Sequence, residues 1–131
     1  MTILKKLTMQ NEVINYINSH NFIGIKAEKE RETFLEIWMV TVNNRIFARS
    51  WGFAERSWYN TFLNDSNGEI KCGNRVFKIR ADIPKDLDAL NEKISQAYLD
   101  KYDSGDNSYY AQGITEQSHV EKTMEFIIQE P

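Results

Sequence analysis

The sequence has few of the residues that build disulfides and zinc sites. It holds one cysteine, Cys72, and two histidines, His20 and His119, which lie far apart along the chain. A single cysteine cannot form an intrachain disulfide, and neither a CxxC nor an HxxxH spacing is present, which argues against a Cys/His zinc site. The low cysteine content favours a reducing compartment, and we expect the protein to be cytoplasmic.

Long apolar runs and an excess of basic charge are also missing. No uncharged apolar run approaches the roughly 18 residues of a membrane-spanning helix. The first ten residues, MTILKKLTMQ, lack the apolar stretch and cleavage site of a signal peptide. Sixteen basic and 19 acidic residues give a net charge of −3, which argues against a protein that coats nucleic acid.

What the sequence does contain is enough apolar and aromatic material for one core. Of 131 residues, 41% are hydrophobic and 12% are aromatic, which excludes intrinsic disorder and fits a single domain over residues 1–131. The patterns predict three helices, over residues 8–19, 57–64 and 86–102, with a mobile polar loop over 103–113. They predict six strands, over residues 22–28, 34–42, 45–51, 68–72, 75–81 and 123–129.

The strand order favours a closed arrangement. Strand 34–42 is apolar on both faces and is followed by Asn43-Asn44, which suits a two-residue hairpin turn. Six strands linked mostly by hairpins leave exposed edges unless the sheet closes. We therefore predict an α+β fold, a six-stranded antiparallel barrel with flanking helices.

Two segments are candidate sites. Arg49, Ser50, Trp51 and Gly52 end a strand, where an arginine fork suits phosphate and a glycine lets a backbone approach closely. The simpler interpretation is a strand end with one surface arginine. The helix from Ser57 carries its aromatic residues at helical spacing, for ring stacking or for the core: Trp58, Tyr59 and Phe62.

Three further features have structural interpretations. A stripe of basic residues on neighbouring strands is most simply a solvated face. Cys72 has no histidine nearby in the sequence to act as a base, so we expect a small buried side chain. Tyr109-Tyr110 is either a lid or a pair packed on the barrel. The basic stripe comprises Lys71, Arg75, Lys78 and Arg80.

The central block RSWGFAERSWYNTFLNDSNGEIKCGNRVFKIRA and the ending TMEFIIQEP resemble a known family. The matching positions are Arg49-Ser50 with Gly52, the block Trp58-Tyr59-Asn60, then Gly73 and Arg80-Ala81. They are similar to those of the deazaflavin-dependent nitroreductase-like proteins, in the pyridoxamine-phosphate-oxidase-like split-barrel superfamily. The closest likeness is to a small prokaryotic branch of that superfamily.

The resemblance implies a homodimeric split barrel that holds FMN or a deazaflavin at its dimer interface, with an oxidoreductase function. It implies that Arg49, Ser50 and Gly52 contact phosphate and that Trp58 and Tyr59 line the site. No catalytic residue and no substrate follow from it.

Two departures from the family pattern keep alternatives open. Three carboxylates, Glu28, Glu30 and Glu32, stand where the family has a basic turn, and they would repel a phosphate. Trp51 replaces a small residue or lysine, and its indole could fill the space of a ring cofactor. The alternatives are a cofactor-free split barrel that binds a small ligand or a protein partner, and a purely structural homodimer.

Overall fold

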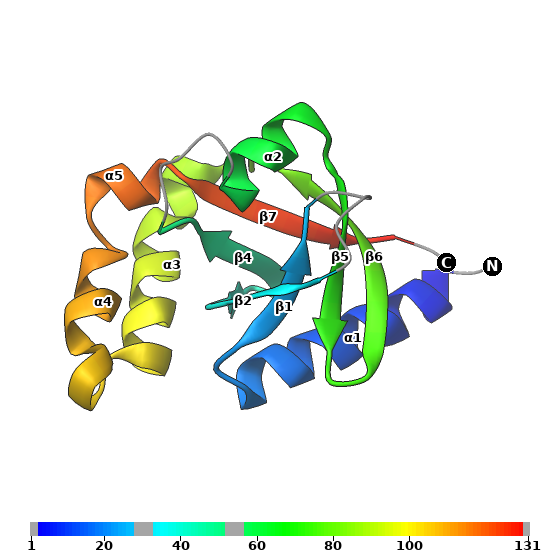
Figure 1. The fold of residues 1–131 in the computed structure, drawn as a ribbon, viewed down its shortest axis with the longest axis horizontal. Coiled ribbons are helices and arrows are strands. Elements are labelled where there is room, and N and C mark those ends of the chain that lie inside the picture. Colours follow the sequence, from blue (N-terminus) through cyan, green and yellow to red (C-terminus); the bar gives the residue numbers. More distant parts are fainter. Residues whose placement is uncertain (1–2, 28–32, 52–56, 130–131) are drawn as a thin grey trace.

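The fold is a strongly curled antiparallel sheet with helices packed on it, as a computed structural model shows (Figure 1). The structure describes residues 3–27, 33–51 and 57–129. Its elements, in chain order, are α1 (Ile3–Ser19), β1 (Ile23–Lys26), β2 (Leu35–Ile37), β3 (Val40–Val42), β4 (Arg45–Arg49), α2 (Trp58–Asn64), β5 (Asn67–Cys72), β6 (Arg75–Asp82), α3 (Leu87–Tyr102), the 3-10 turn η1 (Gly105–Asn107), α4 (Ser108–Gly113), α5 (Gln117–Val120) and β7 (Thr123–Ile128).

The sheet order explains the curl. Seven strands run in the order β2-β1-β5-β6-β7-β4-β3, and each neighbouring pair is antiparallel. The two edge strands, β2 and β3, are consecutive in the sequence, with only Trp38 and Met39 between them. Because consecutive Cα atoms lie about 3.8 Å apart, Ile37 and Val40 are separated by at most about 11 Å. The sheet therefore curls until its two edges come close together.

The predicted six strands become seven at this link. Residues 34–42 were expected to form one strand paired with the return strand, but β2 pairs with β1 and only β3 pairs with β4. The amide of Met39 donates instead to the hydroxyl of Tyr102 at 3.0 Å. A side chain of α3 thus satisfies a backbone group that a continuous strand would have paired with a neighbouring strand.

Local signals account for several elements. Asn43 and Asn44 have φ of 54° and 62°, the left-handed pair that the β3–β4 hairpin turn needs. The Ser57 hydroxyl accepts a hydrogen bond from the Asn60 amide at 3.3 Å and caps α2, as expected. The predicted start of the first helix at residue 8 is wrong, because α1 begins at Ile3 and Thr8 Oγ1 donates to the Leu4 carbonyl within it.

Two hydrophobic cores lie on opposite faces of the β4 region. Ile46 and Ala48 join the core that α1, α2 and the inner sheet face share, whereas Phe47 packs with Val40 against α3. The last predicted strand is confirmed as β7, and its inward face carries Met124, Phe126 and Ile128, which are all buried. Figure 1 shows α3, α4 and α5 grouped at one side of the sheet and α1 beneath the strands.

The polar segment 103–113 is not the loop that its composition predicted. It forms η1 and α4, and Ala111 of α4 is fully buried against α3. Short helices form here because tertiary packing, not propensity, stabilises the turn.

Candidate functional site

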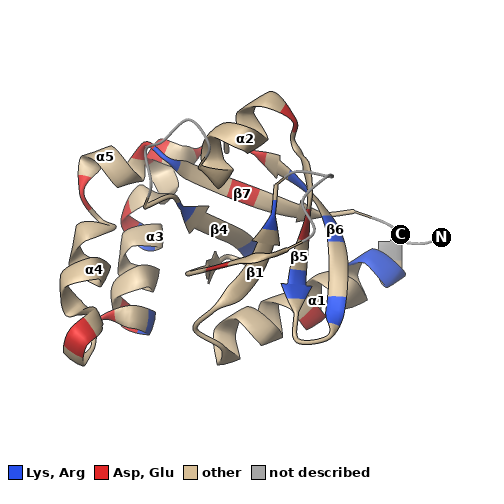
Figure 2. Cartoon of the chain, viewed as in Figure 1, with Lys and Arg blue, Asp and Glu red and all other residues tan. Residues whose placement is uncertain are grey.

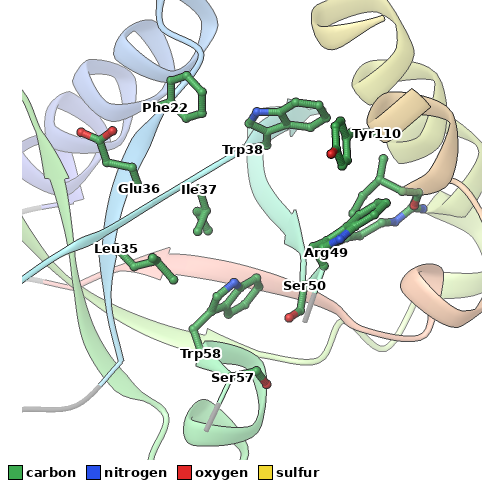
Figure 3. A pocket seen from close by; sticks show the side chains of 12 residues that line it. Phe22, Leu35, Glu36, Ile37, Trp38, Arg49, Ser50, Ser57, Trp58 and Tyr110 are labelled. Atoms are coloured by element: carbon green, nitrogen blue, oxygen red, sulfur yellow. The ribbon is translucent and has the colours of Figure 1, made fainter. Parts of the chain in front are cut away.

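All three tryptophans of the chain line one cavity of about 480 Å³. Trp38 comes from the β2–β3 link and Trp58 begins α2 (Figure 3). Trp51 follows β4. The remaining walls are largely apolar and come from β2, from the residue before β1 and from α4 and its C-terminal end. Their apolar members are Phe22, Leu35, Ile37, Tyr110 and Ile114, and their polar members are Glu36, Arg49, Ser50 and Ser57. A volume of this size lies within the roughly 300–1,000 Å³ of small-molecule sites.

Trp38 is held by a parallel ring behind it. Its indole stacks on Tyr102 with ring centroids 4.2 Å apart and an interplanar angle of 8°. The Tyr102 hydroxyl donates to the Asn21 carbonyl at 2.6 Å and receives the Met39 amide. The ring behind Trp38 is therefore fixed at both the link and the end of α1.

Trp51 has a similar support. It stacks on the buried His119 at 4.5 Å and 8°, and it meets Tyr110 edge-on at 5.4 Å. His119 Nδ1 lies 3.0 Å from the Ser50 carbonyl, which only accepts, so Nδ1 carries the proton. The indole is 44% exposed. Trp51 is among the residues that line the cavity of about 480 Å³.

Arg49 is buried beside the cavity, and protein groups already hold its guanidinium. Nε donates to Thr123 Oγ1 at 3.1 Å, and Nη1 donates to Ser95 Oγ at 2.8 Å and to the Ile114 carbonyl at 3.2 Å. Nη2 donates to the Asn91 carbonyl at 3.1 Å. Burial lowers the pKa of Arg49, and no described carboxylate pairs with it. Four of its five N–H groups thus bind the protein.

The predicted site residues are partly brought together. Arg49, Ser50, Trp51 and Trp58 line the cavity. Tyr59 points elsewhere: its hydroxyl donates to the Glu121 carbonyl at 3.3 Å, and burial raises the pKa of its phenol. Gly52 lies outside the described residues, as do the three carboxylates at positions 28, 30 and 32.

Other candidates have structural roles. Cys72 is buried as expected, and burial raises the pKa of its thiol to about 12, so it is an unreactive thiol near neutral pH. The basic stripe is partly neutralised: Arg75 pairs with Glu12 at 2.7 Å and Arg80 with Asp82 at 3.0 Å. Figure 2 shows these basic segments of β5 and β6 beside the acidic segment of α1.

Two functional supports were missed at the level of sequence. His119 stacks on Trp51 and Tyr102 stacks on Trp38, yet each ring is far from its tryptophan along the chain. The only signal was the aromatic spacing of Tyr98 and Tyr102, one helical turn apart on the buried stripe of α3.

Two kinds of site are absent from the described residues. No group of three His, Cys, Asp or Glu side chains lies close enough to hold a metal ion within residues 3–27, 33–51 and 57–129. In the same part of the chain, no helix has the length and apolar character needed to cross a bilayer.

Comparisons with known proteins give a family and a fold. A family model described as "Uncharacterized protein conserved in bacteria (DUF2255)" matches residues 14–126. No curated protein matches the chain. A solved structure, that of the conserved hypothetical protein Rv2991 from Mycobacterium tuberculosis, is similar with a TM-score of 0.52 and 12% identity, over 88% of this chain and 76% of that one. At this identity the likeness concerns the fold alone.

Proposed function

Because the chain belongs to this DUF2255 family, whose description names no activity, we propose its function from the cavity: the protein binds a planar, largely apolar small molecule against its tryptophans. The observation that carries the proposal is that two of the indoles are each supported by a parallel, buried ring. Trp38 and Trp51 each stack on a buried aromatic ring, at 4.2 and 4.5 Å, and both line the same cavity.

Indoles that are held in place by a neighbouring ring favour the binding of a planar ligand for a physical reason. A side chain that is already ordered loses little conformational entropy when a ligand arrives, and that loss otherwise costs about 0.5–1.5 kcal/mol per side chain. Each well-placed aromatic pair adds about 0.5–1.5 kcal/mol beyond the apolar area it buries. The opposite faces of Trp38 and Trp51, and Trp58 across the cavity, supply these contacts.

The charges of the site favour a ring without a phosphate at Arg49. Four of the five Arg49 N–H groups already bind protein acceptors, so the guanidinium has no fork to offer a phosphate. Glu36 is the only carboxylate among the described lining residues, and it adds negative charge at the wall. The described lining residues suit a flat ring, and Arg49 has at most one N–H group left for a ligand.

A flavin or deazaflavin ring is the second candidate, within a split-barrel superfamily protein of oxidoreductase type. Its support is that Arg49, Ser50 and Trp58, which the family resemblance selected, line the same cavity. Such a group supplies hydride chemistry, and the protein positions and shields it. In this chain the three indoles would hold the ring and exclude water from its faces. The cofactor-free alternative keeps the same cavity for another planar ligand.

A homodimer is a further part of this proposal. Apolar side chains at the cavity wall are exposed, namely Phe22 at 55%, Leu35 at 46% and Tyr110 at 51%. A second copy of the chain that covers them would close the open side of the cavity. Light scattering on the purified protein tests this: we expect twice the monomer mass, and the monomer mass contradicts it.

Intrinsic fluorescence tests the binding proposal directly, because every tryptophan lines the cavity. We expect lumichrome, a neutral tricyclic ring without a tail, to quench the emission saturably. FMN and a deazaflavin are titrated in parallel. Saturable quenching by all three favours a flavin-type site, and quenching by lumichrome alone favours a cofactor-free site. Absence of saturable quenching by any of them contradicts binding of this ring class.

A further inference from the structure

The edge strand β2 has backbone groups that the sheet does not pair. β2 runs from Leu35 to Ile37 and stands at one end of the strand order, so it pairs with β1 on one side only. In an antiparallel strand, successive residues direct their N–H and C=O groups alternately to the two sides. Within this three-residue strand, one or two residues therefore direct both groups away from β1.

The cavity that the three tryptophans line lies along this edge. Side chains of successive strand residues point to opposite faces of a sheet. Leu35 and Ile37 lie on one side of β2 and Glu36 lies on the other (Figure 3). All three nevertheless line the same cavity. A space that touches both faces of β2 must pass its open edge, because β1 closes the other side.

No described part of the chain bonds the open edge of β2. Side chains of α3 do bond the groups that follow it. The Tyr98 hydroxyl donates to the Trp38 carbonyl at 3.5 Å, and the Tyr102 hydroxyl accepts from the Met39 amide at 3.0 Å. The backbone of β2 itself has no hydrogen-bond partner outside β1 in the part of the chain that the structure describes.

We propose that the tryptophan cavity selects planar rings whose rim carries an amide, with an N–H beside a C=O, and that this rim pairs with the open edge of β2. This inference rests on the proposed function. The rim donates its N–H to a strand carbonyl and accepts from the N–H of the same residue, as a neighbouring strand would. The edge is three residues long, which suits one ring rim better than the longer ladder that holds a peptide strand.

The physical reason for the selection is desolvation of the edge. A ring that enters the cavity displaces the water beside β2. If its rim has no polar atoms, the open N–H and C=O groups lose their partners, and this opposes binding. An amide rim replaces the lost hydrogen bonds. Trp38 directly follows Ile37, so adjacent residues supply the stacking surface and the hydrogen-bonding edge.

Two tricyclic rings of the same outline provide the first test. Lumichrome has an amide rim, whereas dimethylphenazine has a plain hydrocarbon rim and is the more apolar ring. Tryptophan fluorescence of the intact chain measures both affinities. We expect dimethylphenazine to bind at least about tenfold more weakly, although stacking and apolar burial alone would favour it. Equal affinities, or tighter binding of dimethylphenazine, overturn this inference and leave the proposed function standing. Saturable binding of neither ring overturns both.

The Glu36→Ala variant separates the strand edge from a side chain beside it. Glu36 is a second acceptor for a ring N–H, because its carboxylate forms no ion pair within the described residues. Alanine removes the carboxylate and keeps the backbone groups. We expect the variant to retain the preference for lumichrome over dimethylphenazine. Loss of that preference would assign recognition to the carboxylate and overturn the pairing with β2.

Hydrogen exchange measures the edge itself. With saturating lumichrome, we expect at least one amide of residues 35–37 to exchange about tenfold more slowly than in the free chain. The amides of the β5–β6 hairpin, which are already paired within the sheet, serve as the internal control and should not change. Unchanged exchange of all three β2 amides in a chain that binds lumichrome overturns the pairing.

Discussion

The indole of Trp51 lies parallel to the imidazole of His119, with ring centroids 4.5 Å apart and an interplanar angle of 8°. His119 is buried and its Nδ1 donates to the carbonyl of Ser50, the residue before Trp51. The strand end, the imidazole and the indole therefore form one unit. The imidazole covers one face of the indole, and Trp51 is one of the residues that line the cavity.

Replacement of Trp51 by alanine should weaken binding of a planar ring without unfolding the protein. The loss of one stacking surface predicts about 5–30-fold weaker affinity, equivalent to roughly 1–2 kcal/mol. Stability should change little, because the indole is 44% exposed. Calorimetric titration with lumichrome measures the affinity. Tyr109→Ala is the matched control, since Tyr109 is 72% exposed and does not line the cavity. Equal affinities for the two variants would contradict the site.

Gly113→Ala should act on the ligand only through Trp51. A Cβ at position 113 would lie 2.8 Å from Trp51 Cη2, so the indole must move. We expect Gly113→Ala to reduce lumichrome affinity about 3–10-fold, and to have no further effect once Trp51 is alanine. Lumichrome affinities of the two single variants and of the double variant form a double-mutant cycle, which measures the coupling between Gly113 and Trp51. Additive losses would show that Gly113 acts by another route.

Arg49→Met should mainly destabilise the fold. The change leaves the carbonyls of Ile114 and Asn91 without their donor, and each buried unsatisfied group costs about 1–3 kcal/mol. We expect a loss of roughly 2–4 kcal/mol in the free energy of unfolding, measured in urea. Arg75→Met, which breaks the exposed pair with Glu12, should cost about 0–1 kcal/mol. A stable Arg49→Met variant that has lost only ligand affinity would contradict this structural role and show that Arg49 binds the ligand.

The raised pKa of the buried Tyr98 phenol predicts that the free energy of unfolding falls at alkaline pH. Burial raises its pKa to about 12 from 10.0, and its hydroxyl accepts the Arg49 amide at 2.8 Å. Between these two values the folded chain keeps a proton that the unfolded chain releases, so stability falls as pH rises from 10 to about 12.

Unfolding measured across that range should therefore show a smaller decline for Tyr98→Phe than for the natural sequence. At neutral pH the variant should be less stable by about 1–3 kcal/mol, because the Arg49 amide loses its acceptor. Parallel pH profiles for the two proteins would mean that Tyr98 titrates alike in both states.

Local patterns predicted the elements whose causes are local. The Asn43-Asn44 turn and the helix predicted over residues 86–102, which is α3, are confirmed, because turn conformation and helix periodicity depend on nearby residues. The break at Trp38–Met39 was missed, because it depends on Tyr102 of α3, 63 positions after Met39, whose hydroxyl accepts a hydrogen bond from the Met39 amide.

The candidate site also has features that the sequence predicted and features that it did not. Arg49, Trp51 and Trp58 were predicted to share a site and they line one cavity. The acceptors that hold Arg49 lie on α3, β7 and the end of α4, so no pattern near Arg49 could show that its guanidinium is already bound. Burial of this kind is a property of the folded chain.

The three indole N–H signals in a ¹H–¹⁵N spectrum test the central claim most directly, because all three tryptophans line the cavity. During a lumichrome titration, we predict that all three signals shift and saturate with one common midpoint, while the amides of α1 away from the cavity stay in place. Indole signals that remain unchanged, or shifts that spread over the chain without saturating, would contradict a binding site at these tryptophans.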